Sequence, residues 1–104
     1  MDAESETYYR RSPHTAWQIM PEGGIVLHLR THELTATNVT GAAVWQELEE
    51  PRTPLELSEA LVRQFAVGPE EALSTVHAFL LQLQEKGLVE VTTDDRPPTT
   101  DDRD

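Results

Sequence analysis

Apart from its carboxylates, this 104-residue chain has few side chains that could carry out metal or acid–base chemistry. Its four histidines, His14, His28, His32 and His77, are scattered, and cysteine is absent. Without cysteine there is no thiolate metal site and no cysteine nucleophile. The pair His32-Glu33 lacks the second histidine of a zinc-protease helix. We therefore predict a protein that is not an enzyme, with no metal and no cofactor.

The charge of the chain restricts its partners. Asp and Glu number 19 against 8 Lys and Arg, which gives a formal net charge of −11. Proteins that bind nucleic acids obtain much of their affinity from Lys and Arg on phosphates, and anionic lipid also attracts cations. No run approaches the roughly 20 apolar residues of a membrane span, and the acidic start is no signal peptide. We expect a cytoplasmic protein that binds neither nucleic acid nor membrane.

The apolar residues predict one small folded domain over residues 17–91. Residues 1–16 hold hardly any aliphatic side chain, and we expect a flexible N-terminal segment there. Residues 92–104 combine five Asp and two Arg with the pair Pro97-Pro98. Such a composition cannot bury enough apolar surface to offset the entropy of ordering. We therefore predict a disordered acidic tail over residues 92–104.

The first half of the predicted domain has the alternation of short strands. Residues 17–20 alternate, and Pro-Glu-Gly-Gly at 21–24 is a turn signal. In the next run Ile25, Leu27 and Leu29 form the apolar face. Residues 33–37 alternate again and are rich in threonine. Strands linked this tightly must be antiparallel, so we predict a three-stranded β-meander with its third strand at an edge.

The second half has the start and stop signals of three helices. Asn38 is a good N-cap for a helix that runs to about Glu50. The sequence Thr-Pro-Leu-Glu at 53–56 is a capping box with proline at the first helical position. A third helix starts after Gly68 and ends before Gly87. The order predicts an α+β fold that resembles a winged helix-turn-helix with the wing placed first.

The predicted edge strand is the feature of this sequence most suggestive of function. Edge strands expose unpaired backbone groups, and proteins usually blunt them with Lys, Pro or a bulge, but residues 33–37 contain neither Lys nor Pro. The edge is therefore either available for a peptide strand or covered, by the Tyr8-Tyr9 segment or a second copy of the chain. One border of the third helix would form a second wall: either Ala72, Thr75, Phe79 and Gln82, or His77, Leu81 and Gln84.

Several motifs together resemble the PqqD family. They are the run Asn-Val-Thr-Gly-Ala-Ala-Val-Trp at 38–45, the run Arg-Thr-Pro-Leu-Glu-Leu at 52–57, and the closing Gly-Leu-Val at 87–89. Each motif alone is weak, but the set is fairly specific and covers most of residues 17–91. The chain departs from the family pattern at Thr37, where a leucine commonly precedes the asparagine.

The resemblance implies a stand-alone recognition element for ribosomally made, modified peptides. In such a domain the leader segment of the precursor adds as a strand to the third strand and packs on the third helix. The carried-over peptide-binding residues are Glu33, Leu34, Thr35, Ala36 and Thr37, with Thr75, Phe79 and Gln82 on the helix. A modifying enzyme, such as a radical-SAM enzyme, a protease or a cyclase, would receive the peptide. The alternatives are a winged-helix transcription regulator and a self-associating scaffold subunit that forms a homodimer.

Overall fold

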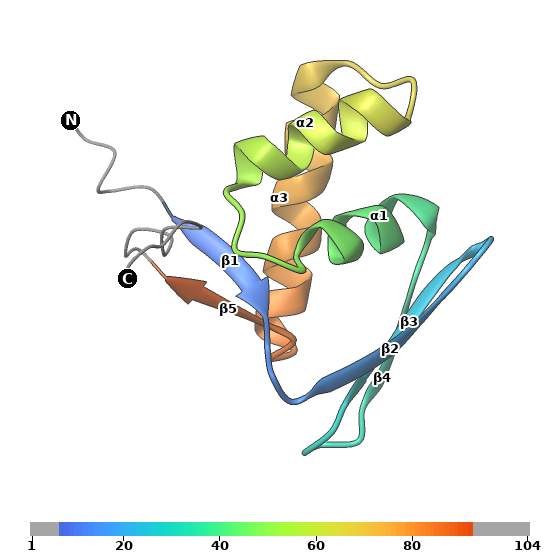
Figure 1. Ribbon diagram of the computed structural model, residues 1–104, viewed down its shortest axis with the longest axis vertical. Helices are drawn as coiled ribbons and strands as arrows, with labels where there is room; N and C mark the ends of the chain where they lie inside the picture. Colours follow the sequence, from blue (N-terminus) through green and yellow to red (C-terminus); the bar gives the residue numbers. More distant parts are fainter. Residues whose placement is uncertain (1–6, 93–104) are drawn as a thin grey trace, which may run out of the picture.

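The computed structural model describes residues 7–92, which form two small antiparallel sheets and three helices (Figure 1). The elements are β1 (Tyr8–Arg11), β2 (Thr15–Met20), β3 (Gly23–His28), β4 (Leu34–Thr37), α1 (Val39–Glu47), α2 (Pro54–Gln64), α3 (Pro69–Glu85) and β5 (Val89–Thr92). The predicted α+β order, a meander followed by three helices, is confirmed. The likeness to a winged helix-turn-helix stays a prediction.

The meander is the three-stranded sheet with the order β2-β3-β4. Trp17 pairs with Val26 across β2 and β3, and Val26 pairs with Thr35 across β3 and β4. Since side chains of paired residues share a face, these three lie on the side of the sheet that faces the helices. In the described chain β4 pairs with β3 alone, so the third strand of the meander is an edge strand, as predicted.

The prediction of a flexible segment over residues 1–16 is wrong for its second half. Tyr8–Arg11 forms β1, which pairs with β5 in the second sheet, and Thr15 begins β2. Tyr8 is buried, so an aromatic ring and backbone pairing replace the aliphatic side chains that this segment lacks. Thr92, predicted to begin the acidic tail, is the last residue of β5. The rest of that predicted tail, residues 93–104, lies outside the described residues.

The core lies between the meander, the second sheet and the three helices. Its largest fully buried side chains include Trp45 of α1, Leu57 and Leu61 of α2, and Leu80 and Leu83 of α3. The meander contributes Val26, while Ile25 and Leu27, expected to form the apolar face of β3, lie on the outer side and are half-buried. Both sides of β3 are therefore apolar, and the outer one has no helix against it in the described chain.

The helix signals in the sequence work as predicted. The Asn38 side chain accepts a hydrogen bond of 2.8 Å from the backbone N–H of Gly41. Thr53 and Glu56 form a complete capping box at the start of α2. Gly87 follows α3 with a φ of 74°, the left-handed conformation that glycine adopts at low cost. Helix α1 ends at Glu47, three residues before the predicted Glu50. Among residues 7–92, no helix is long and apolar enough to cross a membrane.

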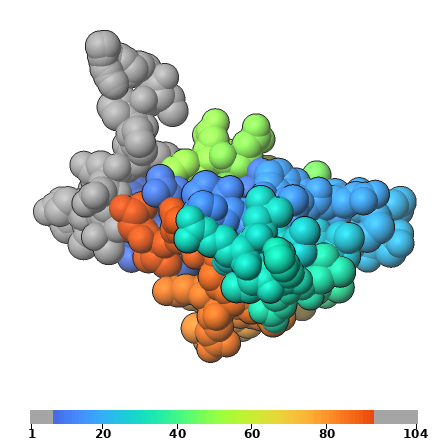
Figure 2. Space-filling model, turned by 90° about the horizontal axis from the view of Figure 1, so that it is seen from below, coloured from blue at the N-terminus to red at the C-terminus, as the bar shows by residue number. Residues whose placement is uncertain are grey.

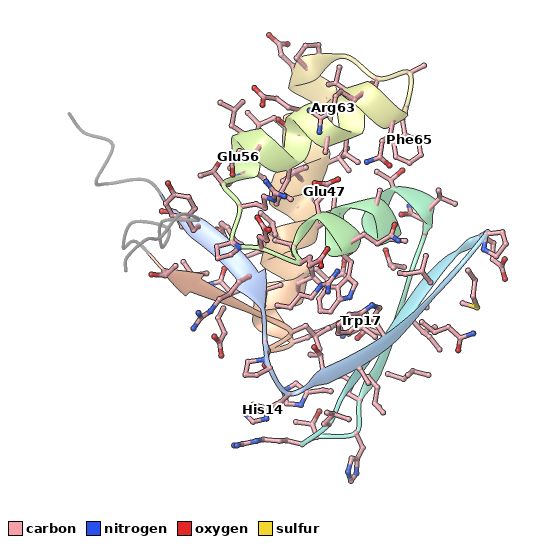
Figure 3. The ribbon with its side chains drawn as sticks, viewed as in Figure 1. His14, Trp17, Glu47, Glu56, Arg63 and Phe65 are labelled. Atoms are coloured by element: carbon pink, nitrogen blue, oxygen red, sulfur yellow. The ribbon has the colours of Figure 1, made fainter. Side chains whose placement is uncertain are left out.

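Arg11 connects the two sheets to the end of α1. Its Nε and Nη2 donate hydrogen bonds of 3.0 and 2.8 Å to the carbonyl oxygen of Trp45, and Nη2 donates another of 3.2 Å to Gln46. The guanidinium carbon lies 4.2 Å from the ring centre of Trp17 and 5.4 Å from that of Trp45. Trp17 points from β2 toward α1 (Figure 3). Burial lowers the pKa of Arg11, and the negative charge of Glu49 partly opposes this shift.

Candidate functional site

The free edge of β4 presents backbone groups that are not used inside the sheet. The N–H of His28 donates to the carbonyl of Glu33 at 2.9 Å, so this pair is a hydrogen-bonded one. In an antiparallel ladder hydrogen-bonded and non-hydrogen-bonded pairs alternate, which places Leu34 and Ala36 in non-hydrogen-bonded pairs with β3. The N–H and C=O groups of Leu34 and Ala36 therefore point away from β3, toward the open edge.

One of the predicted covers for this edge is absent. The Tyr8-Tyr9 segment lies in β1, which pairs with β5 and also bridges to Arg52. Within residues 7–92 no strand pairs with the outer edge of β4. Hence the described part of the chain leaves this edge open to another peptide.

Helix α3 and the start of α1 lie near the two ends of β4. At the start of the strand, Lys86 Nζ forms an ion pair of 2.9 Å with Glu33 Oε2. At the other end, a Cβ placed on Gly41 would touch the side chain of Thr37 and would lie 2.9 Å from the ring of Phe79. The ion pair therefore ties the end of α3 to the start of β4, and Gly41 of α1 packs closely between Thr37 and Phe79. In Figure 2, β4 (teal) lies between the blue strands and α3 (orange).

The three helix residues predicted for the site lie together. Thr75, Phe79 and Gln82 line a hollow of about 370 Å³ between α3 and α1. Its other lining residues are Asn38, Gly41, Val44, Ser74 and Ala78. The hollow adjoins the C-terminal end of β4, but none of residues 33–37 lines it. Lys86 and the wall formed by α1 were not predicted as parts of the site. The signal for the α1 wall is the run Gly41-Ala42-Ala43, whose small side chains let another element approach closely.

The side chains of β4 divide between the two sides of the meander. Leu34, which is 59% exposed, and Ala36 lie on the outer side. Leu34, Ile25 and Leu27 line a shallow hollow of about 210 Å³ there, together with residues 16–18. Thr35 points inward and is buried, and its hydroxyl has no hydrogen-bond partner among the described residues. A strand added beside β4 would therefore meet an apolar outer side and a hydroxyl on the inner side.

Replacing Thr35 with valine is expected to stabilise the protein by about 1 kcal/mol. A buried hydroxyl without a partner costs about 1–3 kcal/mol relative to an apolar group of the same shape. Valine keeps the shape and the β-branching of threonine. The measurement is urea unfolding followed by circular dichroism, and a lower midpoint for Thr35→Val than for the wild type would contradict the unpaired state of this hydroxyl.

Replacing Gly41 with alanine is expected to destabilise the protein by about 1 kcal/mol. A Cβ at this position would overlap Thr37 and crowd the Phe79 ring, and overpacking costs about 1–3 kcal/mol. The higher helix propensity of alanine offsets up to about 1 kcal/mol of this cost. A double-mutant cycle checks the cause, because Thr37→Ala removes the overlapping hydroxyl and should make Gly41→Ala less destabilising. Additive effects in the cycle would show that the overlap is not the reason.

The side chains with potential for catalysis do not come together. His14 lies between β1 and β2, His32 lies in the loop before β4, and His77 lies on an exposed position of α3. The Nδ1 atom of His28 accepts hydrogen bonds from the backbone N–H groups of residues 30 and 31. In the described part of the chain, no group of three or more His, Asp or Glu side chains is placed to hold a metal ion. The outward backbone groups of β4 are suited to pairing with another extended backbone.

The fold and this site define a class: a small α+β domain with an open edge strand beside a helix. The chain belongs to the PqqD family, because the family model described as Coenzyme PQQ synthesis protein D (PqqD) matches residues 23–89. This match agrees with the resemblance inferred from the sequence motifs.

Two solved structures are similar to this chain. One is TbiB1 in complex with the TbiA(beta) leader peptide, with a TM-score of 0.71 and 25% identity over 78% of this chain and 94% of that one. The other is lasso peptide synthetase B1 complexed with the leader peptide, with a TM-score of 0.68 and 23% identity over 79% of this chain and 96% of that one. Comparison with curated proteins gives no significant match.

Proposed function

We propose that this protein is a non-catalytic peptide-binding protein that captures the leader segment of a ribosomally made precursor peptide. The observation that carries the proposal is the free edge of β4, where the backbone groups of Leu34 and Ala36 point outward beside α3. An extended peptide can satisfy these groups by adding as a strand, which is the binding mode known as β-augmentation. Family membership and the TbiB1 complex with a leader peptide support the same role.

In this proposal the peptide-binding residues are those predicted from the sequence. The backbone of residues 33–37 pairs with the leader, and Thr75, Phe79 and Gln82 of α3 form the second wall. The ion pair between Glu33 and Lys86 closes one end of the site. The hollow beside Phe79 provides space for a leader side chain at the other end.

The protein then presents the bound precursor to a modifying enzyme, such as a radical-SAM enzyme, a protease or a cyclase. Tethering raises the effective concentration of the precursor at the enzyme, and the chain itself needs no cofactor for this. We place this role in the cytoplasm. We expect no nucleic-acid binding: in α3, Val76, Leu80 and Leu83 belong to the core, and the adjoining Lys86 is already paired with Glu33.

The test is a titration of the isotope-labelled full chain with the leader of the precursor encoded beside its gene. We expect binding at micromolar strength or better, with the largest amide shifts at residues 33–37. A peptide of the same composition in scrambled order is the control. No shift at residues 33–37 would end the proposal. A radical-SAM or protease gene with a short open reading frame nearby would support it further.

Self-association through the same edge is the competing outcome, because an open edge strand can also pair with a second copy of the chain. In that case the amides of residues 33–37 would broaden as the protein concentration rises, without any leader present. Sedimentation of the free protein would then show a homodimer. A monomer whose residues 33–37 respond only to the leader favours peptide capture.

A further inference from the structure

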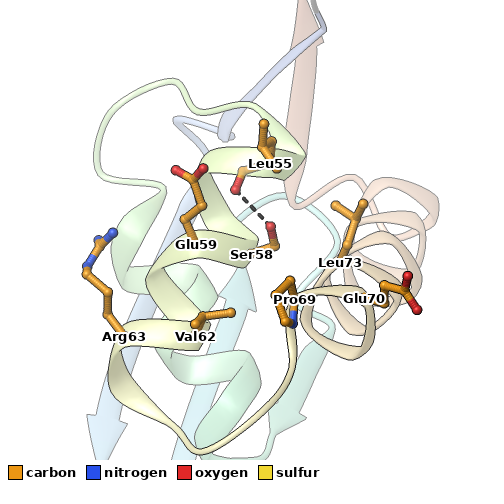
Figure 4. A pocket seen from close by; sticks show the side chains of 8 residues that line it. All are labelled: Leu55, Ser58, Glu59, Val62, Arg63, Pro69, Glu70 and Leu73. Carbon is orange, nitrogen blue, oxygen red and sulfur yellow. Dashed lines mark hydrogen bonds between the residues drawn. The ribbon is translucent and has the colours of Figure 1, made fainter.

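A second groove lies between α2 and α3, on the helical side of the molecule. It has a volume of about 550 Å³ (Figure 4). Its walls are formed by Leu55, Ser58, Glu59, Val62 and Arg63 of α2 and by Pro69, Glu70 and Leu73 of α3. These residues contribute nothing to the site at β4, and the meander lies at the other end of the molecule from α2 (Figure 1).

The floor of this groove is an apolar surface left outside the core. Leu57 and Leu61 are fully buried in the core, whereas Leu55 and Val62 are 58% and 37% exposed. Leu55 and Val62 are seven residues apart, about two helical turns, so they lie along one side of α2. Leu73 of α3 is half-buried opposite them. The result is an apolar strip that runs parallel to α2.

The rim of the groove carries charges that have no partner in the described chain. Glu59 and Arg63 lie on the α2 wall, and Glu70 lies on the α3 wall (Figure 4). None of the three side chains forms an ion pair or a hydrogen bond within residues 7–92. Two carboxylates against one guanidinium make the rim acidic, so it favours an occupant with more basic than acidic flanks.

The walls also determine the backbone conformation of the occupant. Beyond their first turns, the backbone N–H groups of both walls are hydrogen-bonded within the helices, so only first-turn N–H groups such as those of Leu55 and Glu70 lack an intrahelical partner. The Ser58 hydroxyl donates a hydrogen bond of 2.8 Å to the carbonyl of Leu55. An extended peptide would find no ladder of alternating N–H and C=O groups here, such as the edge of a sheet offers. A helix satisfies its backbone internally and can place a ridge of apolar side chains into a groove.

We propose that the groove between α2 and α3 binds an amphipathic helix of a partner protein, with an apolar ridge and basic flanking residues. The proposal does not depend on leader binding, because the two sites use different elements. A protein with both sites could hold an extended peptide at β4 and a helix at α2 and α3 at the same time. The acidic rim disfavours the chain's own acidic segment, residues 92–104, as the occupant.

The test uses two designed helical peptides with the isotope-labelled full chain. Each peptide has about 16 residues, the length at which isolated helices become stable, and a leucine ridge spaced by three and four residues. One peptide carries lysine on both flanks of the ridge, and the other carries glutamate. We expect the lysine peptide to shift the amides of Leu55, Val62 and Leu73 and to bind at least about tenfold more tightly than the glutamate peptide.

Variants distinguish the groove from general attraction to an acidic protein. The double variant Leu55→Ser/Val62→Ser keeps the net charge and should weaken the lysine peptide about tenfold. The variant Glu59→Lys/Glu70→Lys should reverse the preference between the peptides. Glu85→Lys in combination with Glu22→Lys makes the same charge change away from the groove and should preserve the preference.

Three results would overturn the proposal. The first is that neither peptide shifts the amides of the groove. The second is that both peptides bind equally, or that the serine double variant binds as the wild type does. The third is that the free chain dimerises through this groove, seen as a dimer in sedimentation that the serine double variant abolishes. Leader binding at residues 33–37 is measured separately, so its failure and the failure of this proposal are distinguishable.

Discussion

Replacing Ala36 with proline is expected to weaken binding of the leader peptide about thirtyfold, while the domain stays folded. The N–H of Ala36 points away from β3, so its loss leaves the ladder between β3 and β4 intact. Proline is tolerated on an edge strand when the missing N–H faces outward. The lost hydrogen bond and the bulk of the ring toward an incoming strand together cost about 2 kcal/mol.

Ala36→Val is the matched control for this prediction. Valine is similar in size to proline, keeps the N–H group and favours strand conformation. Its affinity for the leader should stay within about threefold of the wild type, as expected when no hydrogen bond is lost. Calorimetric titration of both variants measures the difference. Equal affinities for Ala36→Pro and Ala36→Val would contradict strand addition at β4, and circular dichroism shows whether each variant is folded.

Replacing Arg11 with alanine is expected to destabilise the protein by about 2–3 kcal/mol. The side chain donates hydrogen bonds to the carbonyl oxygens of Trp45 and Gln46 at the end of α1, which otherwise accept only long bonds of 3.1 and 3.2 Å from the N–H groups of Leu48 and Glu49. Hydrogen bonds from a charged donor contribute about 1.5–3 kcal/mol, and a guanidinium over an aromatic ring adds about 0.5–1 kcal/mol. Urea unfolding followed by circular dichroism measures the loss.

Two further variants assign the effect to the geometry of Arg11. Arg11→Lys keeps the positive charge but loses the planar fork, so it should recover less than about half of the lost stability. Arg10→Ala removes an arginine that forms an exposed ion pair of 3.0 Å with Glu90, and such pairs contribute about 0–1 kcal/mol. If Arg10→Ala and Arg11→Ala destabilised the protein equally, the contacts of Arg11 with the tryptophans would have no special weight.

The helices and the meander could be predicted because their signals are local. Asn38 caps α1, the capping box at residues 53–56 starts α2, and Gly87 ends α3. These residues act within one turn of the position that they determine. Strand β1 could not be predicted in this way, because its partner β5 lies about 80 residues further along the chain. Its sequence of two tyrosines and two arginines shows no alternation of apolar side chains.

Two other features depend on tertiary contacts, which the periodicity of apolar residues in the sequence does not predict. Side chains of a strand alternate between its two faces. In β3 both faces are apolar, so this alternation does not show which face packs into the core. Val26 is buried under α1, and Ile25 and Leu27 are turned outward. At the candidate site, helical periodicity predicted two possible borders of α3, and the family resemblance selected the one with Thr75, Phe79 and Gln82. The ion pair between Lys86 and Glu33 could not be predicted from periodicity, because it requires the relative placement of helix and strand.

The shortness of the open edge determines how long a peptide stays. Within β4 only Leu34 and Ala36 turn their backbone groups outward, and the ion pair between Glu33 and Lys86 lies at the start of the strand. Four main-chain hydrogen bonds contribute about 1 kcal/mol each, which is consistent with micromolar affinity once side chains are added. With an association rate of about 10⁶ M⁻¹s⁻¹, a micromolar complex dissociates about once per second. Such a residence time is comparable to the slower turnover of enzymes, so if the leader binds at β4 as proposed, we expect one precursor to leave in time for the next.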